Sequence, residues 1–174
     1  MDTTQERSDV AKSARSTRTC TADGLLKLES DELLKLYRGA STPRLRDISG
    51  DTIGKLVMGC GITPLIDRWL SGLLRETNGW NGKTFRQQDD RRGDGYNRMF
   101  EETRHMFPFN THIGRSRAGD FDALQLDYDV PENPLHIRAV KDEIRELSPG
   151  LYLGQAYVRI LGRSRLACYF SLVK

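Results

Sequence analysis

The second half of the chain alternates apolar and polar side chains with a period of two. In residues 121–129, Leu124, Leu126 and Tyr128 fall on one face of an extended segment, and polar side chains dominate the other. This spacing is typical of a β-strand with one buried face. We therefore predict a strand here, broken by Pro131 and the residues around it.

Two later segments show the same alternation and lie close together in the chain. Residues 151–160 and 166–173 are joined by a short polar link that contains Gly162-Arg163-Ser164. A short link with a glycine favours an antiparallel hairpin. The preceding segment, residues 135–147, fits the helical spacing through its apolar positions and fits a strand equally well. Both alternatives remain open for it.

The first half of the chain has helical spacing instead. Ser30 begins a short apolar stripe that ends at Gly39 and predicts a helix of about two turns. Apolar residues between Asp51 and Glu76 also recur at three and four positions, with breaks at Gly59-Cys60-Gly61 and at Pro64. This pattern predicts two helices that pack on the barrel. We accordingly divide the chain into a tail (1–23), an N-terminal helical region (24–77) and a β-barrel domain (78–174).

Composition limits the class of protein and its partners. The chain has 174 residues, 37% of them hydrophobic, with a mean hydropathy of -0.57, which is typical of one globular domain with appendages. Residues 1–23 contain almost no large apolar side chains, so we expect a disordered tail. Basic and acidic residues are interspersed, with a net charge of +3, so we expect no nucleic-acid partner. We also expect no membrane span, because no apolar run approaches about 20 residues.

Cysteine and histidine spacing argues against several site types. Cys20, Cys60 and Cys168 are far apart and odd in number, which is unlike a disulfide framework and favours a cytoplasmic setting. The three histidines lack metal-ligand spacing, so we expect no metal site and no cofactor. Neither a nucleophile elbow nor a phosphate loop is present in the sequence.

One stretch combines a large indole with flanking glycines. Residues 79–85 run Gly-Trp-Asn-Gly-Lys-Thr-Phe, and glycine lets the chain pass close to the ring of Trp80. We predict that Trp80 closes one end of a barrel of roughly eight strands. Residues 126–131, Leu-Asp-Tyr-Asp-Val-Pro, and Leu153-Gly154 follow later in the chain.

These motifs, over residues 78–174, resemble those of bacterial GxWxG-type lipocalin-like proteins. That family carries a Gly/Trp/Gly signature, a Tyr-Asp segment followed by proline, and a late Leu-Gly. The resemblance implies a calycin-like antiparallel β-barrel and, with the helices before it, an α+β fold. The biochemical role of the family is unsettled, so the resemblance implies little chemistry.

The C-terminal hairpin supplies the candidate binding residues. Strand alternation places Gln155, Tyr157 and Arg159 on one face and Tyr169 on a face of the next strand. If this face lines the barrel, these side chains together with Trp80 would bind the ligand, because a guanidinium flanked by phenols suits a carboxylate in an apolar cavity. The alternative is that Arg159 lies outside in water.

Three functions are compatible with these features. The first is binding of a small, mostly apolar or amphipathic molecule, acidic in one version, in a barrel cavity. The second is a cofactor-free isomerase or cyclase in the same cavity, with His112, Asp127 and Tyr157 as the catalytic candidates that move a proton. The third is a protein-interaction module that uses the N-terminal helices.

Overall fold

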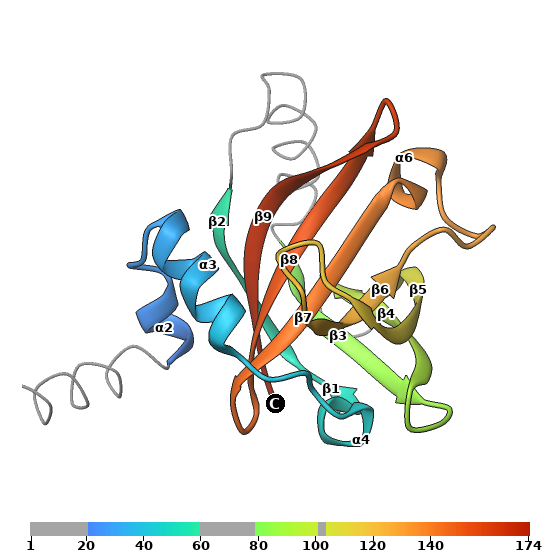
Figure 1. Ribbon diagram of the computed structural model, residues 1–174. Helices are drawn as coiled ribbons and strands as arrows, with labels where there is room; N and C mark the ends of the chain where they lie inside the picture. Colours follow the sequence, from blue (N-terminus) through green and yellow to red (C-terminus); the bar gives the residue numbers. More distant parts are fainter. Residues whose placement is uncertain (1–20, 60–78, 101–103) are drawn as a thin grey trace, which may run out of the picture.

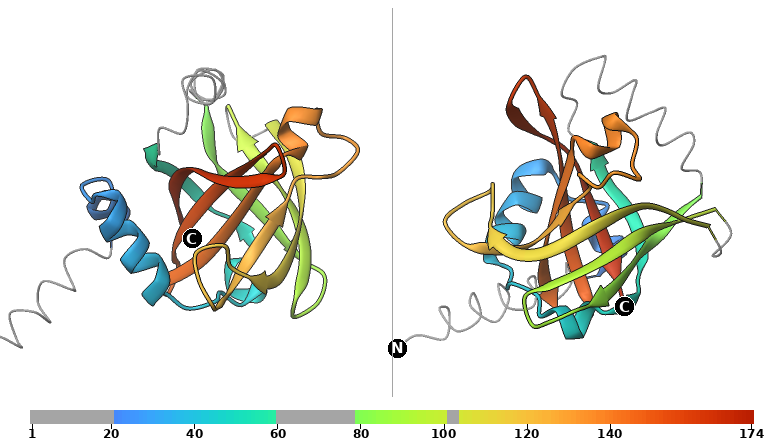
Figure 2. Two further views of the ribbon diagram at one scale, coloured as in Figure 1. Left: turned by 45° about the horizontal axis from the view of Figure 1, so that its top comes forward. Right: turned by 90° about the vertical axis from the view of Figure 1, so that its right-hand side faces the viewer.

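The barrel is built from one antiparallel sheet of nine strands that curls until it nearly closes (Figure 1). A computed structural model describes residues 21–59, 79–100 and 104–174. Short helices lie on one side and at the ends of the barrel (Figure 2). The predicted α+β fold with an antiparallel, calycin-like barrel is confirmed.

Most strands pair with the next strand along the chain, as in a meander. They are β3 (Trp80–Gln87), β4 (Arg92–Met99), β5 (Arg104–Arg115), β6 (Asp122–Asp127), β7 (Val140–Ser148), β8 (Leu151–Ile160) and β9 (Arg163–Val173). β1 (Gly50–Asp51) pairs with β3, and β2 (Ile53–Gly59) pairs with β9. Thr52 joins them, and its backbone N–H donates to the Lys83 carbonyl at 2.9 Å. One continuous segment therefore bridges the two edges of the sheet.

The helix predicted from Asp51 onward is wrong for residues 53–59, which form β2. Ile53, Leu56 and Val57 happen to fit a helical spacing, but the two edges of the barrel need a strand between them. β-Branched residues suit that strand, and Gly54 and Gly59 disfavour a helix. The remainder of the predicted pair of helices, residues 60–76, lies outside the described residues. The expected domain boundary at residue 78 is crossed by the barrel, because β1 and β2 precede it.

The predicted helix from Ser30 to Gly39 is confirmed as α3. Glu29 and Glu32 form a capping box at its start, and Leu33 and Tyr37, one turn apart, are buried. α2 (Ala22–Leu25) precedes it and is capped by the Thr21 hydroxyl, which accepts from the Gly24 N–H at 3.0 Å. α2 thus includes the last two residues of the predicted tail, and residues 1–20 lie outside the described part of the chain.

Two hydrophobic clusters lie on opposite faces of the barrel wall. The outer cluster joins α2 and α3 to β8 and β9 through residues that are all buried: Leu25, Leu33, Tyr37, Leu151, Leu153 and Tyr169. The inner cluster fills the middle of the barrel and includes Phe85, Phe109, Leu124, Leu126, Tyr128, Tyr152, Phe170 and Leu172. The predicted buried face of residues 124–128 is confirmed.

Short helices cover the two ends of the barrel. α4 (Leu45–Ile48) inserts both of its terminal side chains into the inner cluster. At the opposite end, α6 (Leu135–Arg138) inserts Ile137. The segment that the sequence left undecided between helix and strand is therefore both, a single helical turn followed by β7.

Trp80 lies where β2 and β3 meet, at the end of the barrel where β3 begins. A Cβ on Gly54 would come within 2.5 Å of the indole ring, so only glycine fits beneath the ring. Gly82 has a φ of 132°, and a Cβ there would collide with the Thr52 carbonyl. The indole also packs edge-on against Phe170, with ring centroids 5.9 Å apart. The glycine against the indole is thus Gly54 of β2 rather than one of the two that flank Trp80, and Trp80 is half-buried rather than fully enclosed.

Candidate functional site

A lysine ammonium lies inside the barrel, in the half nearer to Trp80. The alternation along β3 that points Phe85 inward also points Lys83 inward, and the Lys83 side chain is only 4% exposed. Its Nζ lies 3.1 Å from Oδ2 of Asp142, which faces inward from β7. It also donates to Asn97 Oδ1 at 2.8 Å and to the Tyr128 hydroxyl at 2.5 Å. We call these four residues the inner centre.

The hydrogen bonds of the inner centre have one consistent direction. Lys83 uses its three N–H donors on three acceptors, and the Tyr128 hydroxyl donates to Asp142 Oδ2 at 3.0 Å. Asn97 Nδ2 donates to the Tyr128 hydroxyl at 3.2 Å, and the Trp80 indole N–H donates to Asn97 Oδ1 at 3.1 Å. Asp142 Oδ1 is buried and has no hydrogen-bond partner among the described residues. The centre therefore has one spare acceptor.

Aromatic rings surround the ammonium. Nζ of Lys83 lies 5.2 Å from the ring centroids of Tyr128 and Phe170, 5.4 Å from that of Phe109 and 5.6 Å from that of Trp80. Such distances allow cation–π attraction, which is stronger when the cation is removed from water. Four aromatic rings thus surround the Lys83 ammonium.

Burial changes the acid–base behaviour of the inner centre. Removal from water lowers the pKa of Lys83, and the neighbouring Asp142 carboxylate offsets part of that effect. Burial and the same carboxylate raise the pKa of Tyr128 well above its ordinary value. A lysine more easily deprotonated than usual therefore lies in contact with a tyrosine that keeps its proton.

A second buried carboxylate lies on the outer side of the same strand. Glu143 is fully buried, and its Oε1 accepts from the Ser116 hydroxyl at 2.6 Å. Its Oε2 accepts from the Arg117 backbone N–H at 3.0 Å, from Arg117 Nη1 at 3.2 Å and from Gln125 Nε2 at 3.3 Å. We call this group the outer centre. It fastens the β5–β6 connection to β7.

The predicted ligand-binding residues are divided between the two faces of the barrel wall. Trp80 faces the interior, whereas Gln155, Tyr157 and Tyr169 are buried on the outer face and Arg159 is exposed. The Tyr157 hydroxyl donates to Gln155 Oε1 at 2.8 Å, and its ring lies 5.4 Å from the Arg117 guanidinium. Arg159 therefore lies in water, the second of the two alternatives. The prediction that it anchors a ligand inside the barrel is wrong.

The predicted catalytic residues also lie on the outer face. His112 is exposed and lies in register with Gln125, and Asp127 forms an ion pair with Lys141. Burial alone would raise the pKa of Asp127, but hydrogen bonds from Lys141 and the Asp129 backbone bring it below its usual value. Tyr157 pairs in register with Lys141. The three candidates are thus near one another across β5 to β8 but do not share a cavity inside the barrel.

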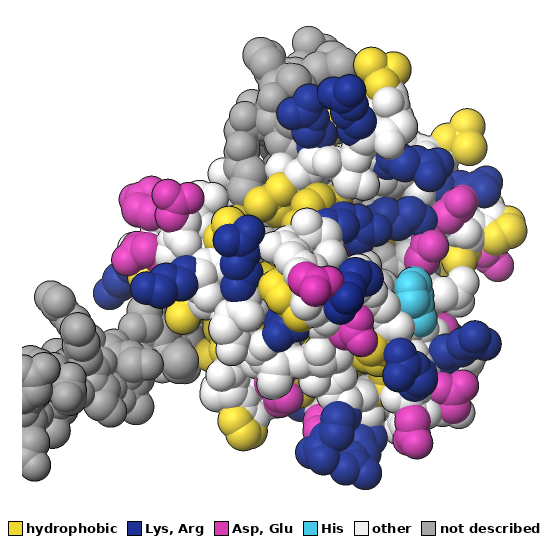
Figure 3. Space-filling view, viewed as in Figure 1, with side chains coloured by type: hydrophobic (Ala, Val, Ile, Leu, Met, Phe, Trp, Pro, Cys, Tyr) yellow, Lys and Arg dark blue, Asp and Glu magenta, His cyan; other side chains and the backbone are white. Residues whose placement is uncertain are grey.

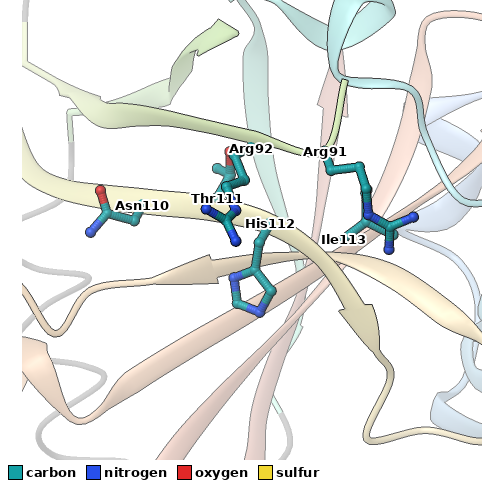
Figure 4. A pocket seen from close by; sticks show the side chains of 6 residues that line it. All are labelled: Arg91, Arg92, Asn110, Thr111, His112 and Ile113. Carbon is teal, nitrogen blue, oxygen red and sulfur yellow. The ribbon is translucent and has the colours of Figure 1, made fainter. Parts of the chain in front are cut away.

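A half-open surface hollow of about 450 Å³ lies beside His112. Figure 4 shows its lining side chains, which come from the start of β4 and from β5: Arg91, Arg92, Asn110, Thr111, His112 and Ile113. Asp89 stands at the same hairpin and accepts hydrogen bonds from the backbone N–H groups of Arg91 and Arg92. Asp90 is adjacent as well, so the two arginines lie in a stretch with no net charge.

Sequence reasoning missed Lys83, Asp142 and Asn97. The sequence contained a signal for Lys83. It lies two positions before Phe85, so both side chains fall on the same, apolar face of β3. For Asp142 the corresponding signal was its place between Val140 and Ile144 on β7. A charged residue in the middle of an apolar stripe is the pattern that predicts a buried polar site.

Within the described ranges no group of His, Cys, Asp and Glu side chains is arranged to hold a metal ion. None of the helices in those ranges is long and apolar enough to span a membrane.

Comparison with known proteins gives one structural match. No protein-family model matches the chain, and no curated protein matches it. The crystal structure of a protein from Thermomonospora curvata superimposes with a TM-score of 0.54 and 14% identity, over 84% of this chain and 88% of the other. At this identity the likeness shows the fold alone. The lipocalin-like family therefore remains a resemblance, and its barrel is the part that the structure supports.

Proposed function

We propose that the protein binds a small, mostly apolar molecule at the Trp80 end of the barrel, beside the inner centre. The buried Lys83–Asp142 pair carries this proposal. Removing two charges from water is costly, and replacing such a pair by apolar side chains is often neutral or stabilising. Folding stability alone therefore does not explain why a charge pair lies among aromatic rings. Binding of a ligand at this pair would explain it.

The hydrogen bonding favours one chemical class of ligand. Lys83 has no N–H left for an acidic ligand, so the acidic version of the sequence-based hypothesis loses its anchor. Asp142 Oδ1 is buried without a partner and would accept from a hydroxyl or an amine. The favoured ligand is thus an apolar molecule with one hydrogen-bond donor.

The packing favours one end of the barrel for this ligand. The inner cluster occupies the middle of the barrel. α4 inserts two side chains at the end away from Trp80, whereas α6 inserts only Ile137 at the other end. Trp80 itself is half-buried and contacts both the inner centre and Phe170. A ligand beside Trp80 would reach the inner centre without crossing the packed middle.

Paired probes test the proposal. 1-Decanol has a donor and decyl methyl ether has none, and quenching of tryptophan fluorescence together with native mass spectrometry measures their binding. We expect about tenfold preference for the alcohol, the worth of one hydrogen bond. The double variant Lys83→Met with Asp142→Leu should lose that preference.

Lys55→Met with Asp23→Leu is the matched control, because it removes an exposed pair of the same type. This control should keep the preference of the unmodified protein. Failure of both probes to bind, or an unchanged preference in the inner double variant, would contradict the proposal.

A second function, proton transfer without a cofactor, is favoured by one observation. Lys83 Nζ contacts the Tyr128 hydroxyl, and burial lowers the pKa of this lysine, which suits a general base inside the barrel. If this function holds, deuterium from solvent should enter 2-decanone next to its carbonyl, as measured by NMR. Lys83→Met should abolish that exchange, and the absence of exchange in the unmodified protein would sink the hypothesis.

The interaction-module hypothesis lacks such support. The buried side chains of α2 and α3 pack against β8 and β9, and residues 60–76 of the predicted helices lie outside the described part of the chain.

A further inference from the structure

The tip of the β8–β9 hairpin carries an apolar side chain that the fold does not need. Leu161 and Gly162 form the two-residue turn, with φ values of 48° and 77°. Turns with two positive φ values favour Asn-Gly, because a larger side chain is strained in the left-handed region. Leu161 is 99% exposed. Leucine is thus unfavourable here both for the backbone and for contact with water.

Unpaired arginines surround that tip. Arg159, Arg163 and Arg165 are exposed, and none forms an ion pair with a carboxylate of the described residues. Strand pairing aligns Arg163 with Ile160 and Arg159 with Ser164, so the cations project from both faces of the hairpin. No Asp or Glu occurs between Glu146 and the C-terminal residue. Figure 3 shows the result, a hydrophobic tip with Lys and Arg side chains below it.

A second exposed leucine lies at the same end of the barrel. Leu135 begins α6 and is 81% exposed. α6 stands beside the hairpin, since the Arg159 backbone N–H donates to the Ala139 carbonyl at 2.9 Å (Figure 2). Of the acidic groups nearby, Asp127 and Asp129 are paired with Lys141 and Arg138. Glu132 remains exposed, so the described part of this end keeps an excess of positive charge.

We infer that this end of the barrel binds peripherally to an anionic lipid surface, with Leu161 and Leu135 inserting among the lipids and the three arginines contacting their headgroups. Apolar side chains that enter the interface, rimmed by arginine, are the combination that anionic membranes attract. A nucleic acid or an acidic protein would match the charges but would leave Leu161 without a role. The inserting end is also the end where Trp80 lies, so an apolar ligand could pass from the membrane to the inner centre.

Co-sedimentation of the full chain with vesicles tests this inference. We expect binding to vesicles of phosphatidylcholine with phosphatidylserine, weak binding to phosphatidylcholine alone, and weaker binding at high salt. Arg163→Gln with Arg165→Gln should weaken binding about tenfold or more. Arg91→Gln with Arg92→Gln is the charge-matched control, because these arginines also form no ion pair with a described carboxylate but lie on the hairpin at the opposite end.

Leu161→Asn is the decisive variant because its two effects have opposite signs. Asparagine fits the left-handed turn, so the midpoint of thermal unfolding should stay or rise, whereas vesicle binding should fall about tenfold. Ile53→Thr is its control, an exposed apolar residue at the far end. No vesicle binding would overturn the inference. Binding that depends on the arginines but not on Leu161 would also overturn it, in favour of a polyanion such as nucleic acid.

Discussion

The inner and outer centres are neighbours in the chain and lie on opposite sides of the barrel wall. Asp142 and Glu143 are consecutive residues of β7, 4% and 0% exposed, and strand alternation sends one into the barrel and the other outward. Each carboxylate lies close to a cation, Lys83 inside and Arg117 outside. Burial and charge pairing are therefore common to both.

The two centres differ in how their acceptors are used. Both oxygens of Glu143 accept hydrogen bonds, and one of the donors is the backbone of the β5–β6 connection. Asp142 receives two donors on one oxygen and leaves the other without a partner. A carboxylate whose two oxygens both accept hydrogen bonds holds the structure together. A buried carboxylate with one unpartnered oxygen can accept a further hydrogen bond, which the fold itself does not supply.

The largest expected effect comes from breaking the inner pair on one side. Lys83→Met leaves Asp142 as a buried carboxylate without its cation and should lower the free energy of unfolding by about 3–5 kcal/mol. Adding Asp142→Leu should restore most of that stability, because the pair is then replaced by apolar volume. Urea unfolding measures both. A double variant as unstable as the single one would show that the inner centre is structural.

The outer centre should behave differently under the same treatment. Glu143→Leu removes the acceptor of the Ser116 hydroxyl and of the Arg117 backbone N–H, and should cost about 3 kcal/mol. Adding Arg117→Leu should not rescue it, since those two donors remain without a partner. Full recovery in this double variant, measured by urea unfolding, would remove the contrast between the centres.

A smaller effect should follow from Trp80→Phe. The ring is largely kept, and the lost interaction is the indole N–H donated to Asn97 Oδ1. We expect a loss of about 1 kcal/mol in unfolding free energy. Because Asn97 Oδ1 also accepts from Lys83, the loss should grow in the inner double variant, where the indole N–H is the donor that remains among the described residues. Equal losses in both backgrounds would place Trp80 outside the inner network.

The smallest effect concerns pH. Burial lowers the pKa of Lys83, so the folded protein releases this proton at a lower pH than the unfolded chain. Between the folded-state pKa and about 10.4, the unfolded chain binds more protons, and stability should rise with pH. Below the folded-state pKa the cost of the buried charge remains in full. The stability of the unmodified protein relative to Lys83→Met should therefore increase as the pH rises from the folded-state pKa of Lys83 toward about 10.4. A flat difference would mean that Lys83 stays charged throughout.

The local sequence pattern was sufficient to predict β6, β8, β9 and the helix from Ser30 to Gly39. In both cases local periodicity and the partners of the fold agree: Leu124, Leu126 and Tyr128 alternate toward the barrel interior, and Leu33 and Tyr37 are one helical turn apart. The Gly-Trp stretch predicted that its own glycines let the chain pass close to the indole ring, but the glycine against the ring is Gly54 of β2, and Gly82 instead allows the approach of the Thr52 carbonyl.

The inward face of each strand was set by the tertiary structure and could not be predicted from alternation. Both faces of β8 are buried, because α2 and α3 cover the outer one. Alternation therefore could not show that Tyr152 faces the interior and Tyr157 the outside. Residues 53–59 fit a helix locally and became a strand because the barrel edges needed a bridge. Lys83 and Asp142 belong to strands far apart in sequence, and a buried charge is tolerable only once its partner has been brought to it by the fold.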